Sequence, residues 1–187
     1  QSTRRLGTLA QRIRPRPNLR LEHVILPPAN RLQLQEVCLR DKNRSRLYSD
    51  LQFGRQLRLG KGLVVLFTGT SGTGKTMAAE ALASERQVDL YQVDMSAVVS
   101  KWVGETEKNI NRVFAEVEGA NAILFFDEAD ALFGKRAEVK DAQDRWANME
   151  VNYLLQRVEA YSSTVILASN LRQNIDDAFL RRIHMIV

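Results

Sequence analysis

Residues 63–76 read LVVLFTGTSGTGKT, and residues 77–83 continue as MAAEALA. The apolar start predicts a buried strand, and the alanine-rich end predicts a helix. Between them lies the pattern G-x-x-x-x-G-K-[ST], filled by Gly69, Thr70, Ser71, Gly72, Thr73, Gly74, Lys75 and Thr76. A strand, a glycine-rich loop and a helix in this order predict a phosphate-binding loop.

The chemistry of this loop follows from its backbone. Glycines let successive N–H groups turn inward around a phosphate chain, and the helix N-terminus adds partial positive charge. Lys75 is placed to reach the β- and γ-phosphates of a nucleotide, and the Thr76 hydroxyl to ligate Mg²⁺. We assign residues 69–76, with Met77 directly after them, to the binding of ATP with Mg²⁺.

Length and composition indicate what kind of protein carries this site. With 187 residues, 44% of them hydrophobic, we expect one domain with a core of its own. No apolar run approaches the ~18 residues of a membrane span, and no signal-peptide pattern is visible. The single cysteine, Cys38, excludes an internal disulfide and fits a reducing compartment. We therefore predict a cytoplasmic protein without membrane insertion.

The net charge of +5 is unevenly distributed. Residues 1–62 hold 14 Lys and Arg against 4 Asp and Glu, and the first twenty residues contain Arg4, Arg5, Arg12, Arg14, Arg16 and Arg20. We predict a basic N-terminal arm or linker at 1–20 and a nucleotide-binding unit at 21–187. A solvated linker is the favoured interpretation of the arm, and contact with nucleic acid or an acidic partner is the alternative.

Strand-like and helix-like segments alternate from residue 63 onward. The predicted strands span 63–68, 88–93, 122–126, 164–168 and 184–187. The predicted helices span 75–85, 105–117 and 141–158, after a short amphipathic helix at 31–40. This alternation predicts an α/β fold with a five-stranded parallel sheet flanked by helices.

Two further predicted strands end in polar residues. The apolar run ILFF at 123–126 leads into Asp127 and Glu128, the Walker B pattern. Asp127 would hold Mg²⁺, and Glu128 would accept a proton from the attacking water as general base. The strand at 164–168 leads to Asn170, which could orient that water. Since parallel strands end at one edge of the sheet, these residues should meet beside the phosphate loop.

Arg181 and Arg182 follow a short helical turn. Paired arginines usually solvate a surface. Here they could act in trans, stabilising the charge that develops on the phosphoryl group bound by a neighbouring subunit.

In this order the motifs resemble the AAA ATPase family. Residues 127–133 resemble its extended Walker B, 168–170 its sensor-1 strand, and 176–182 its second region of homology, which ends in arginine fingers. The resemblance implies a P-loop NTPase fold, Mg-dependent ATP hydrolysis and a homo-oligomeric ring, a hexamer by the family's habit. The sequence is most similar to bacterial members of the family, some of which are associated with phage-tail-like contractile particles.

One segment of the resemblance concerns the substrate. Lys101, Trp102 and Val103, followed by Gly104, resemble the family's first pore loop. There an aromatic and an aliphatic residue grip an extended polypeptide in the ring's central channel. An exposed Trp can intercalate between side chains of any sequence. The alternative is that Trp102 belongs to the core.

Further implications of the resemblance concern the adenine site and the lid. Residues 24–26, with Ile25 at their centre, would lie over the adenine. The family's small helical lid would follow Val187 and is absent from this sequence. Because the arginines must come from a neighbour and the lid adds ring contacts, we expect weak ATPase activity from this chain alone.

These residues favour ATP hydrolysis coupled to remodelling or threading of a polypeptide through an oligomeric ring. The alternative within the same superfamily is a loader or helicase that acts on nucleic acid, for which the basic arm is the only support. A nucleotide-binding scaffold without turnover is a third possibility, disfavoured by Glu128 and the two arginines.

Overall fold

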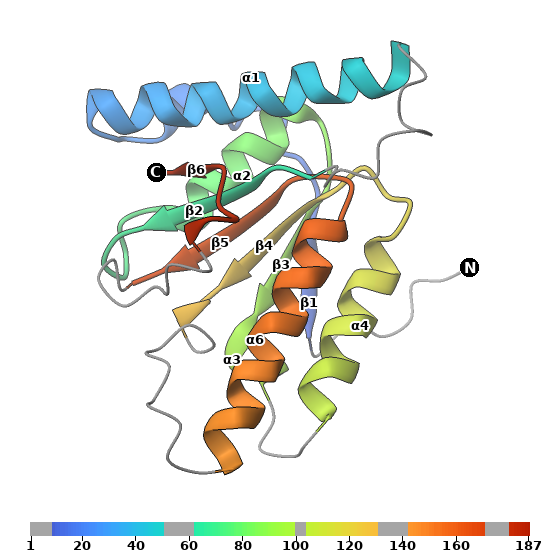
Figure 1. The fold of residues 1–187 in the computed structure, drawn as a ribbon. Coiled ribbons are helices and arrows are strands. Elements are labelled where there is room, and N and C mark those ends of the chain that lie inside the picture. Colours follow the sequence, from blue (N-terminus) through green and yellow to red (C-terminus); the bar gives the residue numbers. More distant parts are fainter. Residues whose placement is uncertain (1–8, 51–61, 100–103, 131–141, 171–179) are drawn as a thin grey trace.

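The computed structural model describes residues 9–50, 62–99, 104–130, 142–170 and 180–187, with the backbone alone at 44–50 and 142–148. Figure 1 shows a twisted sheet with helices on both faces. The helices are η1 (Leu21–His23), α1 (Pro28–Asp50), α2 (Lys75–Arg86), α3 (Met95–Val98), α4 (Glu105–Val117) and α6 (Ala142–Ala160). The strands are β1 (Ala10–Ile13), β2 (Val64–Thr68), β3 (Leu90–Asp94), β4 (Ile123–Asp127), β5 (Val165–Ser169) and β6 (Met185–Ile186).

Within the described residues the strand order is β1-β3-β4-β5-β2-β6. The pairs from β3 to β6 are all parallel, and β2 pairs with β5 in the register Thr68↔Ser169. The α/β fold class is thus confirmed. The order places β4, β5 and β2 side by side, and they run parallel. The carboxyl ends of these three strands therefore lie next to one another at one edge of the sheet.

Two hydrophobic clusters cover the two faces of the sheet, and successive strand residues alternate between them. In β4, Leu124 and Phe126 enter the cluster beneath α4 and α6, whereas Ile123 and Phe125 enter the cluster beneath α1 and α2. All four are buried. A strand with apolar residues at every position therefore fits, because both faces are covered.

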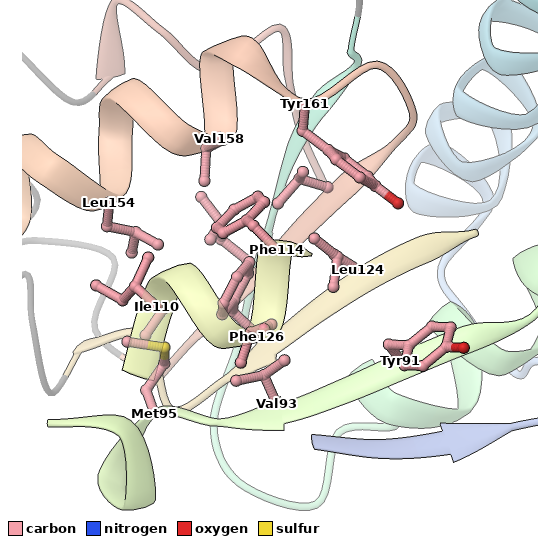
Figure 2. Close-up of a cluster of buried hydrophobic side chains, with 14 of the residues drawn as sticks. Tyr91, Val93, Met95, Ile110, Phe114, Leu124, Phe126, Leu154, Val158 and Tyr161 are labelled. Atoms are coloured by element: carbon pink, nitrogen blue, oxygen red, sulfur yellow. The ribbon is translucent and has the colours of Figure 1, made fainter. Parts of the chain in front are cut away.

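The cluster under α4 and α6 is centred on aromatic rings (Figure 2). Phe114 lies 5.9 Å from Phe126 and 5.8 Å from Tyr161, measured between ring centroids. The buried Tyr161 hydroxyl donates to the carbonyl oxygen of Ala122 at 2.9 Å, and burial raises the pKa of this phenol. A buried hydroxyl with a partner is the expected arrangement. None of the helices among the described residues is long and apolar enough to cross a membrane.

The sheet has six strands among the described residues, not the five that were predicted. The additional strand is β1, which lies inside the segment predicted as an arm. Residues Ala10–Ile13 pair antiparallel with β3, and the Arg12 guanidinium bonds the Asp89 carboxylate at 2.9 Å. This four-residue segment has no alternating apolar pattern of its own. It becomes a strand because the outer edge of β3 offers unpaired backbone groups, which sequence periodicity does not reveal.

The chain after β1 packs along α2. Arg16 pairs with Glu80 at 3.3 Å, its backbone N–H donates to Ser84 Oγ at 2.9 Å, and Arg20 lies 3.9 Å from Glu85. All three partners belong to the helix that begins at Lys75. Part of the predicted arm is therefore attached to the nucleotide-binding unit.

The helix predicted at 31–40 is longer in the structure, since α1 continues to Asp50. Its buried face includes Asp41, whose carboxylate pairs with Arg86 of α2 and accepts from Thr164 Oγ1 at 2.5 Å. The sequence suggests a polar stretch from Asp41 onward. A buried, paired carboxylate breaks the apolar pattern without ending the helix.

Gly62, two residues before the start of β2, allows close approach of two backbones. A Cβ at this position would come within 3.0 Å of the carbonyl oxygens of Tyr161 and Ser163. We expect Gly62→Ala to destabilise the fold by about 2 kcal/mol, because backbone must shift to relieve the overlap. Urea unfolding followed by circular dichroism measures this change.

Gly119→Ala is the matched control for Gly62→Ala. Gly119 has φ +82° and no atom within 4 Å of an added Cβ, so the control reports backbone strain alone, about 1 kcal/mol. A Gly62→Ala chain as stable as wild type would show that the junction before β2 is loosely packed.

Candidate functional site

The sheet topology brings three predicted site segments to one edge. The glycine loop follows β2, Asn170 follows β5 and Asp127 ends β4, and these strands are neighbours in the order β4-β5-β2. The loop N–H of Gly69 donates to the carbonyl oxygen of Ser169 at 3.3 Å. The edge predicted from strand endings is therefore the one at which these residues lie.

The glycine loop ends at the N-terminus of α2. Gly74 is the N-cap residue and has φ +91°, which favours glycine. The Lys75 ammonium donates to the carbonyl oxygens of Gly69 and Thr70 at 2.7 and 2.9 Å, and to Asn170 Oδ1 at 2.9 Å. The Lys75 ammonium thus bonds three protein oxygens at the N-terminus of α2, and a helix N-terminus favours the binding of an anion.

The two acidic residues at the end of β4, Asp127 within the strand and Glu128 directly after it, differ in backbone conformation. Asp127 continues the strand, whereas Glu128 has φ +53°, in the left-handed region. Two hydrogen bonds fix this kink: the Glu128 N–H donates to Asp127 Oδ1 at 3.0 Å, and the Ala129 N–H donates to the carbonyl oxygen of Ala168 at 2.9 Å. Strain held in this way is a feature of functional sites. The left-handed backbone at Glu128 ends β4, and the Glu128 side chain is exposed.

Asn170 is held from two sides. Its side-chain oxygen accepts from Lys75, and its backbone N–H donates to Asp130 Oδ1 at 3.3 Å. Asp130 comes from the turn after β4. The predicted water-orienting residue is thus joined to both the phosphate loop and the acidic turn.

Gln92 belongs to the site and is missing from the sequence interpretation. Its Nε2 donates to Asp127 Oδ2 at 3.3 Å from the neighbouring strand β3. The Asp127 carboxylate therefore accepts one hydrogen bond on each oxygen, from Gln92 on Oδ2 and from the Glu128 N–H on Oδ1. These two bonds orient the carboxylate. The available signal was a lone amide in the middle of the apolar strand LYQVD.

Ile25, predicted to lie over the adenine, and Met77, predicted to contribute to ATP binding, are both exposed. Met77, in the first turn of α2, exposes 43% of its surface, and Ile25 exposes 94%. The neighbours of Ile25, Val24 and Leu26, pack in the same cluster as Ala78 and Ala79 of α2. Ile25 therefore stands on a segment that lies against the helix of the phosphate loop.

Arg181 and Arg182 are not brought to this edge. They precede β6, which runs parallel to β2, whereas the glycine loop follows β2. The five residues of β2 separate the two edges by about 16 Å. Arg182 Nε donates to Glu159 Oε1 at 2.6 Å, at the end of α6, and Arg181 is exposed.

The predicted pore-loop residues Lys101, Trp102 and Val103 lie outside the described residues. Their flanks are α3, which follows β3 without a break, and α4, which begins at Glu105.

The donor set suits Mg²⁺ with a phosphate ligand. Within the described part of the chain no group of three or more His, Cys, Asp or Glu side chains could hold a metal ion. Mg²⁺ is commonly held by one or two protein oxygens, with water and substrate phosphates completing its shell. Thr76 and Asp127 are oxygen donors of this kind at the same edge.

The fold and the glycine loop define a P-loop nucleotide-binding domain. The sequence profile of the ATPase family associated with various cellular activities (AAA) matches residues 65–187, and the chain belongs to this family.

Curated relatives agree with this assignment. The chain is 37% identical over 127 residues to cell division protein C of Sulfolobus acidocaldarius and 38% identical over 124 residues to a spastin homolog of Caenorhabditis elegans. It is 34% identical over 119 residues to a cell division cycle protein 48 homolog of Archaeoglobus fulgidus. Each match covers 63% of this chain, and 34%, 24% and 16% of the respective relatives. The likeness to bacterial members of phage-tail-like systems stays a prediction.

Proposed function

We propose that this chain is the nucleotide-binding part of a Mg-dependent ATPase that remodels or threads polypeptides. The observation that supports hydrolysis most directly is the Lys75 ammonium, which bonds both the glycine loop and Asn170. It joins the element that would bind phosphate to the element that would orient water.

The proposed roles follow from the geometry. The loop amides and Lys75 would bind the β- and γ-phosphates. Met77 would extend this binding site directly after the loop, and Ile25 would lie over the adenine, as the family resemblance implies. Thr76 and Asp127 would hold Mg²⁺, which when bound neutralises charge on the phosphates. Glu128, turned out of the strand, would take the proton of the attacking water, and Asn170 would orient that water.

The position of Arg181 and Arg182 supports a shared site. A strand length separates them from the phosphate loop of their own chain, so they could reach a nucleotide only in a neighbouring subunit. This supports the proposal of a homo-oligomeric ring in which both arginines act in trans, and in which Arg182 would leave Glu159 on assembly. A hexamer remains the family-based expectation.

The threading part of the proposal rests on Trp102 and is tested by substitution in the full-length protein. We expect Trp102→Ala to bind ATP normally but to lose stimulation of turnover by unfolded casein about thirtyfold, because an aromatic anchor is worth about 2 kcal/mol or more. Trp102→Phe keeps an aromatic ring and is expected to retain most of the stimulation. Full stimulation of the alanine variant would refute a grip by Trp102.

A function on nucleic acid has less support. Three of the six arginines in the basic segment, Arg12, Arg16 and Arg20, pair with carboxylates in α2 or in the short connection from α2 to β3. Charge already neutralised within the chain contributes less to phosphate binding.

A further inference from the structure

The carboxylate of Asp127 has a hydrogen-bond donor that belongs to none of the sequence motifs. Gln92, the middle residue of β3, donates from Nε2 to Asp127 Oδ2 at 3.3 Å. The donor to the other oxygen is the backbone N–H of Glu128, which every residue except proline would supply. The contact from Gln92 is therefore the one of the two that depends on the residue type at its position.

Strand alternation places Gln92 and Asp127 on the same face of the sheet. Side chains two positions apart in a strand share a face. Gln92 therefore shares a face with Leu90, and Asp127 shares a face with Phe125. Both of these apolar residues belong to the cluster beneath α1 and α2. Gln92 thus approaches Asp127 on the side of the sheet that is covered by α2, the helix in whose first turn Thr76 lies.

Packing alone does not explain an amide in the middle of β3. Gln92 is half-buried, and its neighbours Tyr91 and Val93 are buried. A polar group in such a place costs free energy unless it is hydrogen-bonded, and leucine would fill nearly the same volume without that cost. The gain from glutamine is therefore to be sought in its contact with Asp127.

The neutral charge of the donor matters for metal binding. A lysine or arginine beside Asp127 would compete with a divalent cation for the carboxylate. An amide fixes the orientation of the carboxylate and leaves its negative charge in place. Groups that hydrogen-bond a metal-ligating carboxylate hold it in its binding orientation and thereby raise the affinity for the metal.

We propose that Gln92 is a positioning residue for Mg²⁺, whose amide holds the Asp127 carboxylate in its metal-binding orientation. In this role Gln92 acts through Asp127 and is not itself a metal ligand. The inference rests on the role of Asp127 in the function proposed above, but it concerns the affinity for the metal and neither hydrolysis nor threading.

Gln92→Leu tests the proposal in the full chain. The measurement is binding of a fluorescent ADP analogue, first in EDTA and then at increasing Mg²⁺ concentration, so no turnover is involved. We expect the variant to bind the analogue like the wild type in EDTA. It should need about tenfold more Mg²⁺ to reach half of the metal-dependent gain in affinity. Gln92→Met also lacks the donor and gives the same test if Gln92→Leu does not fold.

Gln11→Leu is the matched control. Gln11 lies opposite Gln92 in the register of β1 and β3, but it is exposed and stands one strand farther from Asp127. This variant should need as much Mg²⁺ as the wild type. An equal shift in Gln11→Leu and Gln92→Leu would overturn the role of Gln92.

The remaining outcomes separate this inference from the proposed function. If Gln92→Leu needed no more Mg²⁺ than the wild type, or lost affinity by the same factor with and without the metal, the positioning role alone would be refuted. If nucleotide binding by the wild type did not respond to Mg²⁺, the metal site at Asp127 would be refuted, and the role of Gln92 with it.

Discussion

Glu128→Gln is expected to bind ATP as tightly as the wild type and to lose turnover by a factor of about 10²–10⁴. Glutamine has nearly the same shape but is neutral and does not take up the proton of the attacking water. The side chain is exposed and turned out of β4 by φ +53°, so the substitution leaves the core packing intact. The loss should therefore be confined to the chemical step.

The measurement is phosphate release by the assembled full-length protein, with ATP affinity followed separately by a fluorescent nucleotide analogue. Glu118→Gln is the matched control, because Glu118 is also an exposed glutamate, at the end of α4 and outside the site. It should turn over ATP like the wild type. Unchanged turnover in Glu128→Gln would remove this residue from the role of base.

Asp41→Ala is expected to lower the free energy of unfolding by about 3–5 kcal/mol. The Asp41 carboxylate joins α1 to Arg86 of α2 and to Thr164 at the start of β5, and its side chain is 10% exposed. Removal of one partner from a buried ion pair leaves the other without its counter-charge. For a chain of this size the melting temperature should fall by about 10 °C.

Glu36→Ala is the control for Asp41→Ala, because Glu36 lies about one and a half turns earlier on the same helix, α1. Glu36 pairs with Arg40 at 2.6 Å, but both side chains are about half exposed, and an exposed pair contributes only about 0.3–0.5 kcal/mol. Thermal unfolding followed by circular dichroism should thus separate Glu36→Ala from Asp41→Ala clearly. Similar melting temperatures for the two variants would show that burial of Asp41 contributes little.

The elements with strong periodicity were predictable. The helix predicted at 105–117 coincides with α4, whose buried residues Ile110, Val113, Phe114 and Val117 recur at helical spacing. The buried strands β2, β4 and β5 lie within one residue of their predicted bounds. Each of these segments buries enough apolar surface for its pattern to determine its structure.

Elements that depend on distant partners were not predictable. β1 exists through pairing with β3, and Asp41 is buried on α1 where it meets Arg86 and Thr164, far away in the sequence. The same is true of Gln92, whose contact with Asp127 arises only because β3 and β4 are neighbours. Such long-range pairings leave no periodic trace in either segment.

The sequence by itself determined the family, the phosphate loop and the acidic strand end, because a glycine loop between a strand and a helix has its chemistry in its own backbone. Tertiary structure alone decided how Lys75 meets Asn170, how Glu128 leaves its strand, and on which edge Arg181 and Arg182 lie. These depend on strand order and register, which are set by packing between segments far apart in the chain.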